Sequence, residues 1–409
     1  MPRQLPRDVP LLFATRILRL FGYGFLSVVL VLCLTSAGLS ERQTGLLLTL
    51  TLVGDAAISL WITTRADRAG RKGMLLAGAG LMIFAGALFA STRSFWLLLV
   101  AATVGVISPS GNEVGPFLAI EQAALAEELP SGSRTRVFAW YNLAGSFATA
   151  LGAQAGGALA QLLQSRGFAP LESYRAVVIG YAAIGAAMAL LFLRLSPSAE
   201  PPPQRRVQAR PAYLHADLGL AQSRRNVFRL AGLFTLDAFA GGFVVQAFVA
   251  YWFHTRFGVA PAMLGTIFLG ANVLAGISAL LATRIADRIG LLATMVVTHL
   301  PSNALLFFVP LMPSLPWAVG LLLARFSISQ MDVPTRQAYT MALVAPGERS
   351  AAAGVTGIAR TLGASLAPLA AGPLYASAAL AGIPFFLSGG LKILYDLLVW
   401  RSFRKVRLP

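Results

Sequence analysis

Long apolar runs alternate with short polar segments along the whole chain. An apolar α-helix of about 20 residues is long enough to cross the hydrocarbon layer of a bilayer. Measured against that length, the runs predict twelve membrane-spanning helices. The predicted segments are 11–37, 43–65, 74–91, 95–122, 136–163, 174–195, 227–253, 262–282, 291–311, 317–343, 351–378 and 385–400.

A polar, proline-rich stretch at 196–225 separates the first six segments from the last six. It contains Pro201, Pro202 and Pro203, and proline interrupts a helix because it lacks a backbone N–H. The sequence therefore predicts an N-terminal six-helix bundle (1–195), a linker (196–225) and a C-terminal six-helix bundle (226–409).

The two halves share a short charged turn. The pattern A-D-R-x-G occurs at 66–70 and again at 286–290, each time between two predicted spans. Other parts of the halves align at slightly different offsets, as loop insertions would produce. Arg19 pairs with Asp237 at an offset of 218, and Glu121 pairs with Arg336 at an offset of 215, which are positions of opposite charge. This repetition indicates an internal duplication, a common feature of secondary transporters.

The first turn resembles the loop between helices 2 and 3 of the major facilitator superfamily, although Thr63 stands where the family pattern begins with glycine. The resemblance implies an all-α membrane protein with twelve transmembrane helices in two pseudo-symmetric bundles, which moves its substrate by alternating access. It also implies a gate on the cytoplasmic side. The residues assigned to that gate are Asp67, Arg68, Gly70, Arg71, Lys72, Asp287, Arg288 and Gly290.

Composition agrees with a membrane protein. Apolar residues make up 56% of the chain and charged residues 12%, and the mean hydropathy is +0.70. The net charge of +17 does not indicate nucleic-acid binding, because the basic residues lie mainly in tails and loops on one predicted side. By the positive-inside rule, both termini of this multi-pass protein face the cytoplasm. We expect a monomer in the cell (inner) membrane.

Charged residues inside the predicted spans are candidates for function, since each costs roughly 2.5–3.5 kcal/mol at the bilayer centre. The family resemblance implies that helices 1, 4, 7 and 10 line a central cavity. Asp237 is the leading proton-coupling candidate, with Glu113 and Asp332 as alternates. Lys392 and Asp396, spaced i and i+4, predict a self-paired couple. The remaining cavity candidates are Arg16, Arg19, Asn112, Gln246, Arg325, Gln330 and Arg336, while Asp55 and Arg360 lie on other helices.

The fifth predicted span contains a glycine-rich stretch. Gly152, Gly156 and Gly157 resemble the G-P-x-x-G-G core found in proton-coupled antiporters of the superfamily, with Ala153 in place of the proline. This resemblance favours antiport, and such glycines also permit tight helix packing.

Other classes of site lack support in the sequence. Cys33 is the single cysteine, which excludes disulfides and cysteine metal sites. The chain has no G-x-x-x-x-G-K-[ST] phosphate loop and no histidine with metal-ligand spacing. We therefore predict neither an enzyme nor a bound cofactor or metal.

These observations favour proton-coupled efflux of a small organic compound. A transporter of anionic metabolites or oxyanions is the first alternative, because the cavity arginines could bind carboxylate or phosphate. A membrane sensor without net transport is the second.

Overall fold

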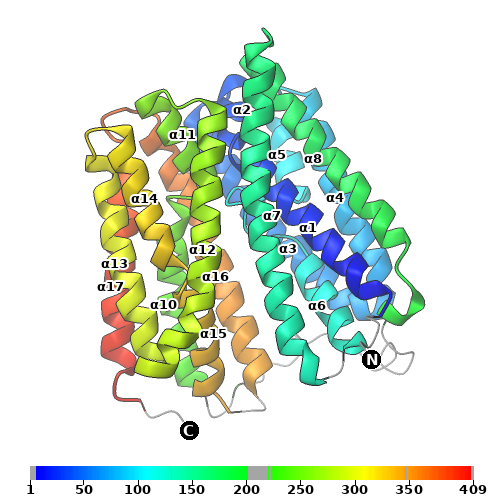
Figure 1. The fold of residues 1–409 in the computed structure, drawn as a ribbon, viewed down its shortest axis with the longest axis vertical. Helices are drawn as coiled ribbons and strands as arrows, with labels where there is room; N and C mark the ends of the chain where they lie inside the picture. The colour runs from blue at the N-terminus through cyan, green and yellow to red at the C-terminus, as the bar shows by residue number, and fades with distance from the viewer. Residues whose placement is uncertain (1–5, 130, 201–219, 221–222, 346–347, 407–409) are drawn as a thin grey trace. The chain divides into compact units, whose positions relative to one another are not determined.

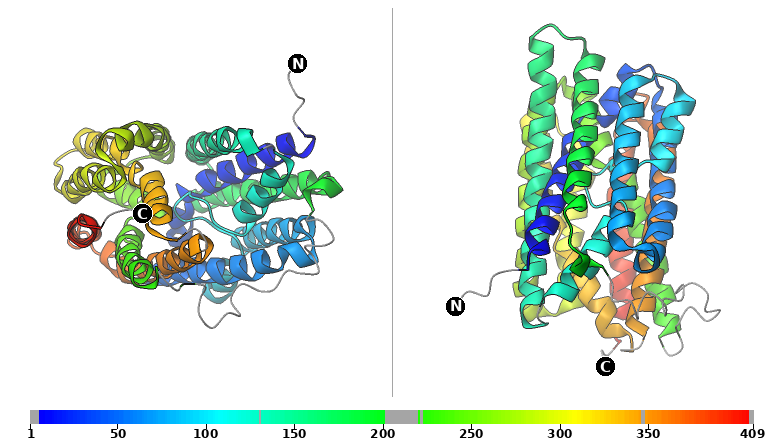
Figure 2. Two further views of the ribbon diagram at one scale, coloured as in Figure 1. Left: turned by 90° about the horizontal axis from the view of Figure 1, so that it is seen from below. Right: turned by 90° about the vertical axis from the view of Figure 1, so that its right-hand side faces the viewer.

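The computed structural model describes residues 6–129, 131–200, 220, 223–345 and 348–406, without the side chains of residues 67, 68, 131–136, 139 and 350. These residues form helices and no strands (Figures 1 and 2). The helices are α1 (Asp8–Ser27), α2 (Leu30–Ser36), α3 (Glu41–Ala69), α4 (Arg71–Ser91), α5 (Phe95–Val104), α6 (Phe117–Glu128), α7 (Ser131–Ser165), α8 (Pro170–Leu193), η1 (Pro197–Ala199), α10 (Arg224–Gly242), α11 (Gln246–Phe257), α12 (Pro261–Ile289), α13 (Leu291–Phe308), η3 (Val309–Leu311), α14 (Leu315–Ser329), α15 (Asp332–Leu343), α16 (Arg349–Tyr375) and α17 (Ile383–Phe403).

Each predicted segment corresponds to one long helix or to a broken pair. Eight of the described helical stretches are long and apolar enough to cross a membrane. The first, fourth, seventh and tenth segments are divided, into α1 and α2, α5 and α6, α10 and α11, and α14 and α15. The breaks thus fall at the same positions in both halves, as a duplicated chain predicts.

The prediction of one continuous helix over 95–122 is wrong. Residues 105–116, between α5 and α6, are not helical. Gly111 and Gly115 have φ values of 71° and 82°, which a side chain would disfavour. Pro109 and Pro116 also lack the N–H that a helix interior needs. This non-helical stretch brings polar residues, and backbone groups outside any helix, into a spanning segment.

The repeated turns need their glycines for a conformational reason. Gly70 lies between α3 and α4 with φ of 99°, and Gly290 lies between α12 and α13 with φ of 87°. Glycine adopts such angles at little cost because it has no Cβ. Both copies of the turn therefore reverse the chain at an equivalent glycine.

The chain divides into two compact units. Unit 1 comprises residues 1–39, 50–214 and 260–269, and unit 2 comprises 40–49, 215–259 and 270–409. The first residues of α3 thus belong to unit 2, and those of α12 belong to unit 1.

Equivalent helices pack closely inside each unit. In unit 1, a Cβ built on Gly24 of α1 would lie 2.1 Å from the carbonyl oxygen of Thr149 on α7. In unit 2, a Cβ on Gly242 of α10 would lie 2.6 Å from the carbonyl oxygen of Ala364 on α16. Since no Cβ fits at such distances, both glycines permit the same backbone approach.

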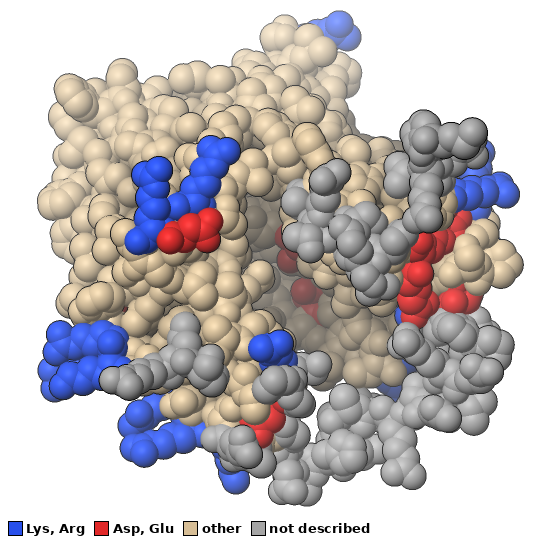
Figure 3. All heavy atoms as spheres, turned by 60° about the horizontal axis from the view of Figure 1, so that its bottom comes forward, with Lys and Arg blue, Asp and Glu red and all other residues tan. Residues whose placement is uncertain are grey.

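Basic side chains gather at one end of unit 2. There, an apolar cluster brings Leu230 near the start of α10 together with Phe403 at the end of α17. Arg224, Arg404 and Lys405, which are exposed, lie next to these positions in the chain. Figure 3 shows groups of Lys and Arg on the face drawn forward.

Candidate functional site

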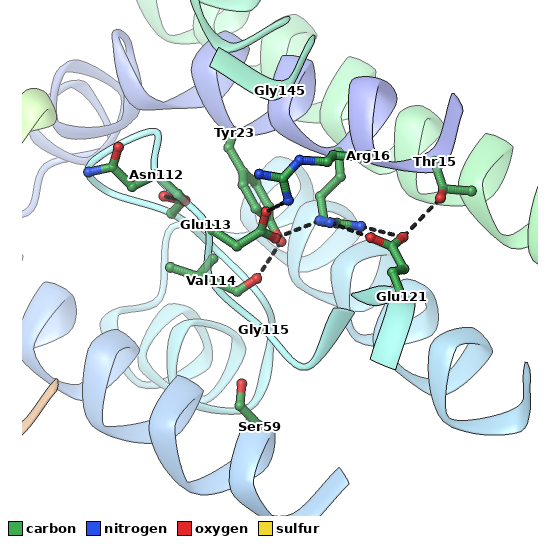
Figure 4. A network of polar contacts seen from close by, with 12 residues as sticks. Thr15, Arg16, Tyr23, Ser59, Asn112, Glu113, Val114, Gly115, Glu121 and Gly145 are labelled. Carbon is green, nitrogen blue, oxygen red and sulfur yellow. Dashed lines mark hydrogen bonds and ion pairs between the residues drawn. The ribbon is translucent and has the colours of Figure 1, made fainter. Parts of the chain in front are cut away.

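Two buried arginines of α1 converge on acidic residues of the fourth predicted segment. Arg16 Nη1 and Arg19 Nε each lie 2.7 Å from an oxygen of Glu113. Arg19 also donates two hydrogen bonds of 2.7 Å to Glu121. Figure 4 shows the side chains of Arg16, Glu113 and Glu121 in this cluster. Both predicted cavity arginines of unit 1 are therefore paired with carboxylates of the same unit.

The cluster extends to α7. Glu121 is fully buried and accepts hydrogen bonds from Thr15, at 2.9 Å, and from the hydroxyl of Tyr141. Arg16 donates to the carbonyl oxygen of Tyr141 at 2.9 Å and to Asn142 Oδ1 at 3.1 Å. One polar network thus joins α1, α6 and α7.

The non-helical stretch is held by side chains of other helices. Asn112, which is exposed, and Glu113 lie within it, and Figure 4 shows the chain passing from Asn112 to Gly115. Backbone groups at membrane depth must be satisfied by the protein or by water in a cavity. Four side chains do so. Tyr23 donates to Val114 O at 2.9 Å, Asp55 Oδ1 accepts from Gly115 N at 2.7 Å, Thr149 donates to Gly111 O at 3.4 Å, and Tyr181 donates to Val106 O.

Asp237 is the centre of the charge cluster in unit 2. Its side chain is buried and accepts hydrogen bonds from Arg336 of α15 at 3.1 Å and from Arg360 of α16 at 3.0 Å. Lys392 of α17 donates to its other oxygen. The leading proton-coupling candidate is thus shared by cations from three helices.

The two alternate carboxylates are paired as well. Asp332 lies 2.6 Å from Arg336 Nη1, one helical turn away on α15, and Glu113 is bound by Arg16 and Arg19. Each of the three candidates therefore has at least one guanidinium partner within its own unit.

A histidine connects Asp237 to a second carboxylate. Nδ1 of His299, on α13, lies 2.7 Å from Asp396 Oδ1, and its Nε2 lies 3.9 Å from Asp237 Oδ1. Asn303 also donates to Asp396, at 2.9 Å. The predicted self-pairing of Lys392 with Asp396 is wrong, because Lys392 donates to Asp237 and Asp396 bonds to α13.

The remaining cavity candidates have different surroundings. Gln246 Oε1 accepts from Asn272 at 3.3 Å, and the backbone N–H of Gln330 donates to a serine hydroxyl of α12. Among the described residues, Arg325 has no hydrogen bond or ion pair, and its guanidinium lies 4.9 Å from the ring centre of Phe326. Arg325 thus has no described carboxylate within ion-pair distance, although Asp332 and Asp237 are near enough to interact with it electrostatically.

The first charged turn holds other parts of unit 1. Arg71 forms hydrogen bonds of 2.8 and 3.2 Å with Glu127 at the end of α6. The backbone N–H groups of Arg71 and Lys72 donate to Glu200 at 2.8 and 3.0 Å, and Lys72 Nζ donates to the carbonyl oxygen of Leu193 at 2.6 Å. The turn thereby fixes the start of the linker to the N-terminus of α4.

The gate function of the two turns stays a prediction. The side chains of Asp67 and Arg68 lie outside the described residues. Asp287 and Arg288, at the end of α12, are exposed.

The antiporter-like glycines are packing positions. A Cβ on Gly152 or Gly156 would lie 2.0 Å from the carbonyl oxygen of Phe21 or Phe25 of α1. A Cβ on Gly157 would lie 2.2 Å from the carbonyl oxygen of Pro261, in the part of α12 that belongs to unit 1.

Several residues of these networks received no role from the sequence. Asp55 and Arg360 are charges inside apolar runs, but they lie outside helices 1, 4, 7 and 10, which the family resemblance implies line the cavity. His299 had no acidic neighbour in sequence, so its contact with Asp396 was not predictable from spacing. Among the described residues, no group of three or more His, Cys, Asp or Glu could hold a metal ion.

Apolar helices with polar networks buried inside them define a polytopic membrane protein. The sequence profile of the Major Facilitator Superfamily matches residues 12–368, and the chain belongs to this superfamily. It is therefore a transporter of small molecules and not an enzyme.

Known proteins resemble the chain over nearly its full length. It is 30% identical to the uncharacterized membrane protein YJR124C of Saccharomyces cerevisiae, over 96% of this chain and 93% of that protein. A bacterial homolog of the human lysosomal transporter Spinster, in an inward-facing and occupied conformation, has a TM-score of 0.74 at 18% identity and 98% coverage of both chains. A D-xylose–proton symporter has a TM-score of 0.72 at 16% identity, over 96% of this chain and 97% of its own. At these identities the two structures show the shared fold.

Proposed function

We propose that the protein exports a small organic compound in exchange for protons. The observation that carries this proposal is the cluster around Asp237, in which one buried carboxylate is shared by three cations from α15, α16 and α17. A proton on Asp237 would neutralise the carboxylate and weaken its ion pairs with these cations. Binding or release of the proton would therefore change contacts among four helices. Such a charge change can bias a protein with two conformations.

In this proposal Asp237 is the leading proton carrier, and Glu113 and Asp332 are the alternates. The direction, export by antiport, comes from the resemblance of the glycine-rich part of α7 to proton-coupled antiporters. The proposed location is the cell (inner) membrane. Both termini would face the cytoplasm, because basic termini and loops stay on that side. The protein would work as a monomer.

A fluorescence assay in inverted membrane vesicles tests the proposal. A pH-sensitive dye reports a proton gradient made by respiration, and compounds of a broad panel are added in turn. A compound carried by antiport releases protons from the vesicles and restores the fluorescence, in vesicles with the protein but not in matched vesicles without it. If radiolabelled counterflow shows transport of a compound that leaves the gradient unchanged, proton antiport is wrong for that substrate.

One observation favours a second function, transport of an organic anion. The polar interior of unit 2 holds the carboxylates Asp237, Asp332 and Asp396, whereas its basic side chains are Arg325, Arg336, Arg360 and Lys392. Among the described residues, Arg325 is the member with no carboxylate within ion-pair distance, and a guanidinium binds carboxylate or phosphate well. Anion transport predicts counterflow of small carboxylates that Arg325→Gln abolishes, without a proton flux.

A further inference from the structure

Asp55 differs from the other carboxylates inside the predicted spans of unit 1. It lies at the middle of α3, whose ends are Glu41 and Ala69, so each end is about 21 Å away along the helix axis. Its side chain is partly buried. Next to it, a Cβ on Gly54 would lie 1.8 Å from the carbonyl oxygen of Thr103, so α3 lies directly against α5 at this depth.

The partners of Asp55 are all neutral. Oδ1 accepts a hydrogen bond of 2.7 Å from the backbone N–H of Gly115 and one of 3.4 Å from the hydroxyl of Ser59. No described basic side chain lies within ion-pair distance of it. By contrast, Glu113 pairs with Arg16 and Arg19, and Glu121 pairs with Arg19.

The ionisable groups that face Asp55 do not supply a positive charge. Glu113 of the non-helical stretch, Tyr23 of α1 and Tyr181 of α8 are near enough to interact with it electrostatically. Arg19, which interacts electrostatically with Tyr23, is already bonded to two carboxylates.

Charge balance separates Asp55 from the expected proton carriers. A proton on Asp237 or Glu113 has to compete with buried cations, so its binding there is coupled to the breaking of ion pairs. A proton on Asp55 would remove an unpaired negative charge from the middle of the membrane, where an ionised carboxylate is disfavoured. We propose that Asp55 is a proton-binding site of unit 1, which forms an O–H bond with a proton from water and later returns it.

The position of Asp55 connects its protonation to the ion pairs of Glu113. Its acceptor oxygen holds Gly115, two residues after Glu113, which binds both arginines of α1. A change at Asp55 would therefore reach the ion-pair cluster through the non-helical stretch. This inference rests on the proposed function and deepens it. Asp237 belongs to unit 2, and Asp55 would be a second residue that exchanges protons, in unit 1.

A purely structural role for Asp55 predicts a different result from proton binding. If the carboxylate only accepts a hydrogen bond from Gly115, Asp55→Asn preserves its role, because the amide oxygen accepts the same bond. If Asp55 binds a proton, Asp55→Asn removes the function and Asp55→Glu retains it in part.

Infrared difference spectroscopy tests proton binding without a substrate. Purified protein in lipid nanodiscs is compared between about pH 5 and pH 8, and the carbonyl band of a protonated carboxylic acid is recorded. We expect a band that is present in the wild type, absent in Asp55→Asn and shifted in Asp55→Glu. The control is Glu172→Gln, an exposed carboxylate at the start of α8, which should leave the band unchanged. A band identical in wild type and Asp55→Asn would overturn the inference.

Transport then distinguishes this inference from the proposed function. We expect Asp55→Asn to lower proton-driven transport at least about tenfold while substrate exchange changes less than about twofold. Full proton-driven transport in Asp55→Asn would contradict a coupling role for this site. If the wild type moves substrate without protons but the Asp55 band still titrates, the proposed antiport fails and the proton-binding site stands.

Discussion

Arg19 donates to Glu121 in unit 1, and the equivalent positions in unit 2, Asp237 and Arg336, form the same ion pair with the charges reversed. The pair joins α1 to α6 in unit 1 and α10 to α15 in unit 2. In each half these helices belong to the first and the fourth predicted segments. The duplicated scaffold has therefore retained charge complementarity at this place and not the individual residues.

Loss of the unit 1 pair should be strongly destabilising. Arg19 is fully buried, and removal of one partner leaves a buried charge without compensation, which costs about 3–5 kcal/mol. We expect Arg19→Gln to lower the thermal unfolding midpoint of the purified protein markedly. Arg166→Gln, at an exposed position, serves as the control. An equal midpoint in both variants would show that the pair contributes little.

Asp237→Asn should abolish uphill transport and leave substrate exchange measurable, because the amide keeps the shape of the side chain and loses the proton. The substitution also leaves three cations without their carboxylate, so folding needs a check. The double variant Asp237→Asn/Lys392→Met removes one of those cations and should recover stability without recovering coupling. Unchanged proton-driven accumulation in Asp237→Asn would assign the role to another carboxylate.

Close helix contacts predict unequal effects of alanine at two glycines. A Cβ at Gly156 would overlap the backbone of Phe25, whereas nothing lies within 4 Å of a Cβ at Gly320. Overpacking costs about 1–3 kcal/mol, and alanine favours a helix over glycine by about 1 kcal/mol. Gly156→Ala should therefore lower thermal stability, while Gly320→Ala should preserve or raise it. The reverse order would disprove the close packing of α1 on α7.

Stability should depend on the protonation of Glu128, which lies outside the predicted spans. Burial raises the pKa of this carboxyl, the Ser198 hydroxyl lowers it, and the Asp8 carboxylate raises it, with a net increase. The folded protein then binds this proton more tightly than the unfolded chain. This contribution is present at low pH and is lost as pH rises through the raised pKa. Unfolding midpoints measured against pH should change less in Glu128→Gln than in the wild type; parallel curves would contradict this.

Cysteine labelling tests the orientation. Cys33 is 3% exposed, so we expect little labelling of this natural cysteine. The unaltered chain therefore gives the background for each introduced cysteine. An impermeant reagent should label Ser165→Cys in intact cells and label Ala209→Cys, in the linker, only after permeabilisation, because basic loops stay in the cytoplasm. Labelling of Ala209→Cys in intact cells would reverse the topology.

The apolar runs predicted the helical fold and the order of the segments, because membrane-length helices leave a strong pattern in sequence. The four breaks were harder to predict, since residues such as Val28 and Gln330 carry no helix-breaking signal of their own. The stretch at 105–116 was the exception, with two prolines and three glycines present in the sequence. The pairing of charges was not predictable, because Lys392 could bond one turn along its helix or to Asp237, and only the packing of α10 against α17 decides between them.

The non-helical stretch has a consequence for how the protein enters the membrane during synthesis. Its backbone groups are bonded by Tyr23 and Asp55, which precede it in the chain, and by Thr149 and Tyr181, which are made later. While the nascent chain ends before α8, the carbonyl oxygen of Val106 lacks its partner, and an unsatisfied backbone group in lipid costs several kcal/mol. The fourth segment should therefore remain shielded by the insertion machinery until α8 has emerged from the ribosome.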